Sequence, residues 1–396
     1  MTNKIELLMP AGDLPRLKAC LLYGADAVFI GGKRFSLRAK ASNFTIDDIK
    51  EGVEFAHALN KKVYVTVNIV PHVNDLKDIE QYLYDLQNVG VDAVIVSSLA
   101  IVMFMKENNF TMECHISTQV SASNASYLDF YQRLNCPRVV LARESTIEDI
   151  KSIRKHNDLE LEVIIQGGLC SSYSGRCTLS NYFVCRDANR GGCAHSCRWD
   201  YTLYQNGEKV ADETFKIASK DLMGICQVPA LIEAGVSSLK VEGRMKSLNY
   251  VAIVARTYRK IIDLCYEGAL TEQDLIEAGN ELSKIENRPL CTGYLGGDGQ
   301  YNALQIYQDE SRMVNQTYLG IIEKECDDGL VKIIRKNDIY VGQKVEIYGY
   351  DIEPVEFIID KLFDDDGEIS IANNTQKNVF IKLPIKVKQY YLLRQK

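Results

Sequence analysis

Residues 21–32 read LLYGADAVFIGG and residues 86–98 read LQNVGVDAVIVSS, and the two stretches follow one plan. In each, an amphipathic segment ends at a glycine, Gly24 or Gly90, and an apolar run rich in valine and isoleucine follows directly. Glycine is common just after the last turn of a helix, and strands covered on both faces by helices are rich in branched aliphatic residues. The repeated plan predicts a helix that passes straight into a parallel strand.

Similar apolar runs recur over the first 245 residues, with helical segments between them. The runs begin at Ile5, Asp26, Lys62, Asp92, Phe110, Arg138, Leu159 and Ser237. Eight parallel strands that alternate with helices are typical of an α/β fold of the TIM-like (β/α)8 barrel type or a close variant. A doubly wound open sheet is the alternative fold, but no GxGxxG motif follows the first strand.

The pattern of elements divides the chain into three parts. Residues 1–286 form the expected barrel with its flanking helices, interrupted by a cysteine-rich loop at 166–200 and then by a hairpin that turns at Asn206-Gly207. Residues 287–316 are polar and irregular, which indicates a connector. Six short strand-like runs in residues 317–396 predict a small antiparallel β-barrel domain.

The composition of the 396 residues limits the class of protein. A hydrophobic fraction of 46% and a charged fraction of 25% are ordinary for a soluble globular protein. No apolar run reaches the roughly 18 residues of a membrane span, and the polar start does not resemble a secretory signal. We therefore expect a cytoplasmic protein with no membrane partner, whose 12 cysteines stay reduced rather than forming a disulfide framework.

Four cysteines of the loop, with the spacing C-x6-C-x15-C-x3-C, are candidate metal ligands: Cys170, Cys177, Cys193 and Cys197. Several thiolates brought to one place suit a soft metal centre, and nearby glycines and arginines allow close backbone approach and offset negative charge. The spacing favours a [4Fe–4S] cluster. Zinc, which usually takes tighter cysteine pairs, and buried thiols without a metal remain open alternatives, as does a role for Cys185.

The same segments resemble one protein family. The stretches GGLCSSYSGRCTLSNYF (167–183), NRGGCAHSCRWDY (189–201), HISTQVSASN (115–124) and LKVEGRMKSLNYVA (239–252) are similar to the U32 family, named as collagenase-like peptidases. The N-terminal stretch from Leu7 and the C-terminal tail continue the likeness, so the resemblance covers nearly the whole chain.

The resemblance is greatest to the branch of the family that makes 5-hydroxyuridine at the wobble position of tRNA. It implies a tRNA hydroxylase that works without O2, holds a [4Fe–4S] cluster on the four cysteines and uses prephenate as cosubstrate. It also implies tRNA as partner, with a paralogous U32 protein as a further candidate. Two positions depart from the family pattern: Gln166 stands where a histidine is common, and Met223 stands where a cysteine is frequent.

Polar residues at the ends of the expected strands are candidates for the barrel mouth, because barrel enzymes build their active sites there. Alternation places His115, Ser117 and Gln119 on one strand face, and Glu242 and Arg244 on another. A carboxylate such as prephenate suits the forked donors of arginine. We expect catalytic roles for His115, Gln119 and Glu242, and substrate-binding roles for Arg38, Asn68, Arg143, Glu144 and Arg244. A buried structural His115 and a structural Arg143–Glu144 ion pair are the simpler alternatives.

The net charge of −7 means that the chain as a whole does not attract phosphate, so a tRNA site must be a local patch. The arginines of the cysteine loop and the cations between Lys382 and Lys396 are the candidates. Two other function classes compete with tRNA hydroxylation. A U32-type peptidase is one, although no GxSxG or HExxH motif is present, and a metal-stabilised module that binds RNA or a partner without catalysis is the other.

Overall fold

The computed structural model describes residues 4–37, 42–297, 305–306, 316–326 and 329–396. The chain divides into two compact units, one of Met1–Asn280 with Asn287–Met313 and one of Glu281–Glu286 with Val314–Lys396. No helix in the described parts of the chain is long and apolar enough to span a bilayer.

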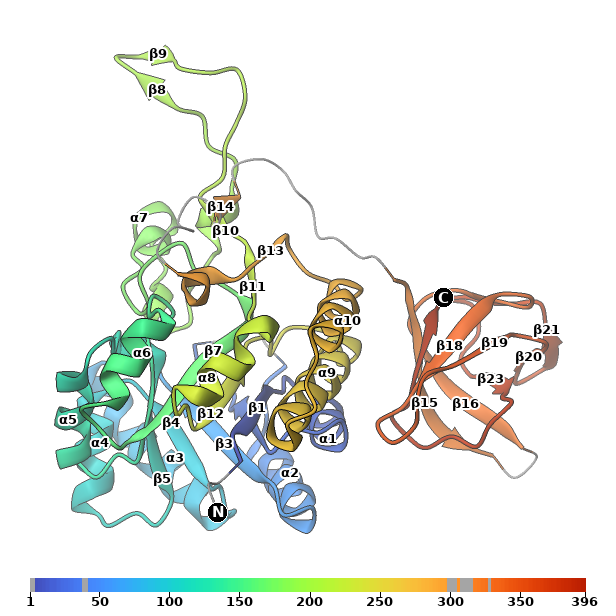
Figure 1. The fold of residues 1–396 in the computed structure, drawn as a ribbon, viewed down its shortest axis with the longest axis horizontal. Helices are drawn as coiled ribbons and strands as arrows, with labels where there is room; N and C mark the ends of the chain where they lie inside the picture. Colours follow the sequence, from blue (N-terminus) through green and yellow to red (C-terminus); the bar gives the residue numbers. More distant parts are fainter. Residues whose placement is uncertain (1–3, 38–41, 298–304, 307–315, 327–328) are drawn as a thin grey trace. The chain divides into compact units, whose positions relative to one another are not determined.

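The first unit is built on a closed ring of eight parallel strands (Figure 1). These are β1 (Glu6–Pro10), β2 (Ala27–Gly31), β3 (Lys62–Val67), β4 (Ala93–Val96), β5 (Glu113–Ile116), β6 (Arg138–Val140), β7 (Glu160–Gly168) and β12 (Ser238–Val241). Each strand pairs with the next, and β12 closes the ring by pairing with both β7 and β1. The predicted TIM-like barrel is therefore confirmed, and the open doubly wound sheet is excluded.

Helices lie around the outside of the ring, and the last two of them follow β12. They are α1 (Leu14–Leu22), α2 (Ile46–Ala58), α3 (Val73–Asn88), α4 (Leu99–Glu107), α5 (Ala125–Arg133), α6 (Ile147–Arg154), α8 (Val228–Glu233), α9 (Leu248–Glu267) and α10 (Glu272–Ser283). Thr45 and Thr146 begin α2 and α6 with reciprocal capping boxes. Gly24 and Gly90 follow α1 and α3 with φ angles of 112° and 83°, as the opening sequence plan predicts.

The cysteine-rich insertion leaves the barrel after β7. It contains α7 (Leu179–Val184) and the turns η2 (Ala188–Arg190) and η3 (Ser196–Arg198), then a hairpin of β8 (Tyr204–Gln205) and β9 (Glu208–Lys209) that projects from the barrel in Figure 1. The strand β11 (Asp221–Met223) returns antiparallel to β7. The predicted turn at Asn206-Gly207 is confirmed, since both residues have positive φ.

Residues 290–297 and 305–306 are more regular than the sequence suggests. The two-residue strands β13 (Leu290–Cys291) and β14 (Gln305–Ile306) pair with β11 and with β10 (Ala218–Ser219). Strands this short carry no readable hydrophobic period, so sequence reasoning treats them as irregular. The short helix η5 (Gly293–Gly296) lies between them.

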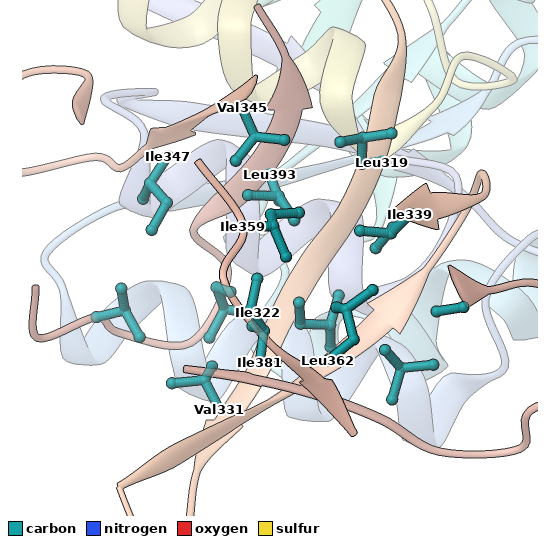
Figure 2. Close-up of a cluster of buried hydrophobic side chains, with 14 of the residues drawn as sticks. Leu319, Ile322, Val331, Ile339, Val345, Ile347, Ile359, Leu362, Ile381 and Leu393 are labelled. Atoms are coloured by element: carbon teal, nitrogen blue, oxygen red, sulfur yellow. The ribbon is translucent and has the colours of Figure 1, made fainter. Parts of the chain in front are cut away.

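The second unit is a curled antiparallel half-barrel. Its main sheet has the order β19-β18-β24-β15-β16-β23-β20-β21, in which β19 and β21 are the edges within the described residues. The strands are β15 (Tyr318–Glu325), β16 (Leu330–Arg335), β18 (Lys344–Tyr348), β19 (Val355–Ile358), β20 (Leu362–Asp364), β21 (Gly367–Ile369), β23 (Val379–Lys382) and β24 (Leu392–Gln395), with a separate pair β17 (Ile339–Tyr340) and β22 (Ile371–Ala372). Figure 2 shows the inward side chains of its core, among them Leu319, Val345 and Leu393. The antiparallel β domain expected from the tail is thereby confirmed.

Candidate functional site at the barrel mouth

A pocket opens where the carboxyl ends of the barrel strands meet. Five residues selected from the sequence line it: Asn68, Gln119, Arg143, Glu242 and Arg244. They come from the ends of β3, β6 and β12 and from the turn η1 (Thr118–Val120) that follows β5. Closure of the barrel therefore brings together side chains that lie far apart in the sequence.

Arg143 and Glu242 form an ion pair across this pocket. The Arg143 Nη2 atom lies 3.0 Å from Glu242 Oε1, and the two side chains are only 8% and 18% exposed. Among the described residues, no acceptor lies within hydrogen-bond reach of the buried Arg143 Nε atom. One donor of the guanidinium is thus occupied by Glu242, and the buried Nε atom has no acceptor among the described residues.

Arg244 is a buried guanidinium in the wall of the same pocket. Its Nη2 atom donates to Ser36 Oγ at 2.8 Å and its Nη1 atom donates to Thr66 Oγ1 at 3.3 Å. A Cβ atom at Gly31 would lie 1.5 Å from Nη1, so only glycine leaves room for this side chain. Arg38, the third arginine expected here, falls in the segment 38–41, outside the described residues.

Asn68 and Glu144 hold backbone around the pocket. Asn68 Oδ1 accepts a hydrogen bond from the Leu37 backbone at 3.2 Å. Glu144 is absent from the pocket lining, and its Oε1 atom accepts hydrogen bonds from the backbone and hydroxyl of Ser174 at 3.0 and 3.3 Å. The position of Glu144 therefore favours anchoring of the cysteine loop over the expected contact with substrate.

His115 lies inside the barrel and does not line the mouth pocket. Its Nε2 atom is 2.8 Å from Glu113 Oε2, and its ring packs edge-on against Tyr64 with the centroids 4.8 Å apart. The imidazole hydrogen bond lowers the pKa of Glu113. This environment favours the simpler sequence alternative, a buried structural histidine, over a catalytic one.

A network of buried charges in the barrel interior was missed by the sequence reasoning. Lys240 Nζ lies 2.7 Å from Glu162 Oε1, and Arg138 lies 2.6 Å from Glu6 and 3.4 Å from Glu162. Lys240 also lines the mouth pocket and lies over the ring of Phe29. The alternation that selected Glu242 and Arg244 continues back to Lys240, so the same signal could have found it.

The four candidate cysteines line a second pocket: Cys170, Cys177, Cys193 and Cys197. Leu37, Gln119 and Arg143 belong to the linings of both pockets, so the cysteines lie directly beside the barrel mouth. Cys185 is not part of this lining; it is exposed and ends α7 with a φ of 50°. The structure thus separates the four matched cysteines from Cys185, which sequence spacing could not do.

The thiols of this pocket affect one another's ionisation. Burial raises the pKa of Cys177 and of Cys197, and the neighbouring Cys170 and Cys193 raise both further. Burial also lowers the pKa of Arg198, and the adjacent Arg288 lowers it further. Both arginines line the cysteine pocket, so positive charge is concentrated where four thiolates would need compensation.

The donor set and the backbone around it fit a thiolate-bound metal group. Four thiols share one pocket, and glycines bring the loop close to neighbouring backbone: a Cβ at Gly192 would lie 2.5 Å from the Asp187 carbonyl oxygen. The described residues contain no group of three cysteine, histidine, aspartate or glutamate side chains arranged to hold a single metal ion. Were an iron–sulfur cluster bound, the four cysteines of this pocket would be the residues that hold it.

We expect Gly175→Ala to loosen the cysteine loop. Gly175 has a φ of 75°, and a Cβ there would lie 1.9 Å from the Gln119 carbonyl oxygen. The loop must move away from η1, in addition to a left-handed backbone penalty of about 1–2 kcal/mol. Amide hydrogen exchange should increase across residues 170–197. Gly207→Ala is the matched control, because it also has positive φ but nothing within 4 Å; equal exchange in the two variants would contradict the expectation.

The two departures from the family pattern lie opposite each other in the structure. Gln166 on β7 is paired in register with Met223 on β11. Gln166 is fully buried and its Oε1 atom accepts a hydrogen bond from Tyr258 at 2.9 Å. Neither residue lines the mouth pocket or the cysteine pocket. The Gln166 departure therefore lies in the packing beneath the site, outside both pocket linings.

The barrel is closed and parallel, and the pocket at its strand ends lies beside an insertion that carries four cysteines. These features define a TIM-like barrel protein with cysteine thiols at the barrel mouth. The chain belongs to the U32 family. The model described as Peptidase family U32 matches residues 12–305, and the Peptidase family U32 C-terminal domain matches residues 314–394. The resemblance stated from the sequence is thereby confirmed.

Several named proteins are similar to this chain over most of their length. The tRNA hydroxylation protein P1 of Bacillus subtilis is 39% identical, covering 100% of this chain and 96% of the relative. The tRNA hydroxylation protein P of Escherichia coli is 33% identical, covering 87% of this chain and 86% of the relative. A collagenase of Porphyromonas gingivalis is 29% identical, covering 98% of this chain and 96% of the relative.

Proposed function

We propose that this chain is a cytoplasmic tRNA hydroxylase that converts wobble uridine to 5-hydroxyuridine without O2, using prephenate and a [4Fe–4S] cluster. The observation that carries the proposal is the junction of two pockets, one lined by four cysteines and one by arginines and Glu242, which share Gln119 and Arg143. The similarity to tRNA hydroxylation proteins supports uridine in tRNA as the substrate class.

The cysteine pocket is the proposed cluster site. Replacing the C5 hydrogen of uridine with a hydroxyl group is a two-electron oxidation, so the reaction needs either an oxygen donor that is itself reduced in the step or an external acceptor that takes both electrons. A cluster near the base would relay these electrons one at a time and would not be the terminal oxidant. A bound cluster supplies electron transfer or a binding site for substrate. The neighbouring Arg198 and Arg288 would offset the negative charge of the four thiolates.

The mouth pocket is the proposed site for prephenate. Arg143 and Arg244 supply guanidinium groups, and Lys240 adds a third cation to the lining. A guanidinium fork matches the two oxygens of a carboxylate, and the unpaired Arg143 Nε atom is a donor without an acceptor in the described structure. Gln119 and Glu242 are the proposed groups that orient the uracil and hold a proton, because both line the pocket and Glu242 pairs with Arg143.

Anaerobic purification followed by iron and acid-labile sulfide analysis and a visible absorption spectrum tests the cluster. Mass spectrometry of tRNA nucleosides from a deletion strain, with and without the complementing gene, tests the reaction. We expect stoichiometric iron and sulfide, and loss of wobble 5-hydroxyuridine that the gene restores. Stoichiometric zinc without visible absorbance would favour the metal-stabilised binding module, and unchanged 5-hydroxyuridine in the deletion strain would overturn the proposed reaction.

We expect Arg143→Lys to weaken the use of prephenate. Lysine keeps a positive charge beside Glu242 but loses the planar fork that matches a carboxylate. The KM for prephenate should rise roughly tenfold, the loss of about 1.4 kcal/mol of charge-assisted hydrogen bonding. The KM is measured by following tRNA hydroxylation in a reconstituted reaction at different prephenate concentrations. Arg133→Lys, at the exposed end of α5, is the control; an equal KM for Arg143→Lys and the unaltered protein would remove Arg143 from the binding site.

A peptidase is the second candidate, because the family is named for one and a collagenase is among the similar proteins. The relevant experiment incubates the purified, iron-loaded chain with gelatin and casein. Cleavage that persists after removal of iron would favour this candidate. Absence of cleavage, together with restored tRNA hydroxylation, would exclude it.

A further inference from the structure

The cysteine-rich insertion carries a group of exposed aromatic rings that the proposed chemistry does not use. Tyr182 is 82% exposed, Phe183 is 43% exposed and Trp199 is 40% exposed. Their rings are neighbours: the Phe183 centroid lies 5.1 Å from that of Tyr182 and 6.1 Å from that of Trp199. We call these three residues the aromatic platform. Large rings gathered on a surface usually mark an interaction site.

The aromatic platform is supported from beneath by further rings. The Tyr201 ring lies 5.6 Å from Phe183 and 5.9 Å from Phe215, centroid to centroid. Tyr201 donates a hydrogen bond from its hydroxyl to the Ser196 carbonyl oxygen at 2.7 Å, which ties this layer to η3. The central ring, Phe183, is thus held by packing before any partner arrives, which reduces the entropy lost on binding.

The aromatic platform is continuous with the cysteine pocket. The helix α7 carries Tyr182 and Phe183, and its first residues, Leu179 and Ser180, line that pocket. Trp199 follows η3, which contains the pocket residue Cys197. Figure 1 shows α7 beside the carboxyl ends of the barrel strands. A molecule on the platform therefore lies next to the proposed reaction site.

The charge around the aromatic platform is opposite in sign to that of the whole chain. Residues 168–199 contain four arginines against one aspartate, a net charge of +3, whereas the chain carries −7. Two of these arginines already hold protein groups: Arg190 pairs with Asp75 and Arg176 donates to Ser121. The others, Arg186 and Arg198, flank the two ring-bearing segments. Exposed rings with local positive charge suit a polyanion that presents flat apolar faces.

We propose that Tyr182, Phe183 and Trp199 stack unpaired nucleobases of a single-stranded RNA loop and so present the neighbouring base to the mouth pocket. The proposal rests on the proposed function, in which the substrate is a uridine in a tRNA loop. Proteins read single-stranded RNA largely by stacking unpaired bases on aromatic side chains, which a duplex does not offer. A base that reacts inside a pocket must leave its stack, and stacking its neighbours on protein stabilises that state.

Trp199 provides a direct test, because it is the only tryptophan in the chain. Titration of the full chain with an unmodified anticodon stem-loop RNA should quench its fluorescence, since a stacked base quenches indole emission. A fully paired RNA of the same length should quench little. No quenching by the stem-loop at concentrations that saturate binding in fluorescence anisotropy would overturn the proposal.

Single variants test whether the rings contribute to binding. Tyr182→Ala and Phe183→Ala should each raise the Kd for the stem-loop roughly tenfold, as expected for loss of one base–aromatic stack. Phe130→Ala, on α5 and 44% exposed, is the matched control and should leave the Kd unchanged. An unchanged Kd for the platform variants would overturn the proposal. It would also be overturned if sedimentation showed that the unaltered chain self-associates through these rings and that the variants do not.

The two proposals fail separately. If the stem-loop quenches Trp199 but no variant or deletion alters 5-hydroxyuridine, the aromatic platform binds RNA and the proposed reaction is wrong. If hydroxylation depends on the gene while quenching is absent and Tyr182→Ala hydroxylates normally, the reaction stands and the platform is wrong.

Trp199→Phe, which keeps a ring, should retain hydroxylation better than Trp199→Ala.

Discussion

Cys193→Ala is expected to abolish cluster binding, and with it tRNA hydroxylation. The Cys193 thiol lies in the pocket with Cys170, Cys177 and Cys197, where burial already makes the thiols of Cys177 and Cys197 harder to ionise. Bound iron would stabilise their thiolate forms, so the proposed cluster would depend on all four ligands acting together. Iron and sulfide per chain and the visible absorbance should fall to background, and 5-hydroxyuridine in tRNA should be lost.

Cys185→Ala is the matched control for this experiment. It makes the same chemical change in the same insertion, but Cys185 is exposed and outside the cysteine pocket. Iron, sulfide and activity should stay near those of the unaltered chain. Full iron content in the Cys193→Ala protein, or loss of iron in the Cys185→Ala protein, would show that the four-cysteine assignment is wrong.

Glu162→Ala is expected to destabilise the barrel by about 3–5 kcal/mol, the usual result of leaving a buried charge without its partner. The Glu162 side chain is fully buried between Lys240 and Arg138, which lie 2.7 and 3.4 Å away. Its removal leaves Lys240 without a carboxylate inside the barrel. The free energy of unfolding in urea measures the effect.

Glu160→Ala is the control for this second experiment, because Glu160 also pairs with Arg138 but its side chain is 49% exposed. Exposed ion pairs contribute about 0–1 kcal/mol, so Glu160→Ala should change the stability little. If both variants lost the same free energy of unfolding, the buried Glu162 would not be the residue that stabilises the interior charge network.

The same carboxylate should make the barrel sensitive to acid. Burial by itself raises the pKa of Glu162, but Lys240 and Arg138 outweigh burial and hold the pKa below its ordinary value. A lowered pKa in the folded state means that the carboxylate stabilises the fold above its unfolded pKa of about 4.3. This contribution is lost as the pH falls through the folded pKa. The variant Glu162→Ala should therefore lose less stability on acidification than the unaltered chain.

Much of the fold could be predicted because its signals are local. The apolar runs beginning at Ile5 and Ser237 each form a strand, and a helix that ends at Gly24 or Gly90 follows from a few adjacent residues. The family resemblance rests on motifs that can be read in the same way. The two-residue strands β13 and β14 escaped prediction because they are defined by their partners and carry no period of their own.

The site could be predicted only in part. Alternation along expected strands selected Gln119, Glu242 and Arg244, and the structure brings them together at the mouth. The strand assignment itself is wrong for all three, because Gln119 lies in η1 and the other two follow the end of β12. The same alternation selected His115 but could not tell its depth in the barrel, and it passed over Lys240. Depth depends on how neighbouring strands are staggered around the ring, which a single strand does not record.

The sequence by itself determined the eight-stranded barrel, the thiol-rich insertion and the family, because hydrophobic period, glycine positions and cysteine spacing act over short stretches of chain. Only the tertiary structure decided that Cys185 lies apart from the other four thiols, that Glu144 anchors the loop and that the cysteine pocket shares Arg143 with the mouth. These facts depend on closure of β12 onto β1 and on the fold of the insertion over η1. Such contacts join residues distant in the chain, and no local pattern specifies them.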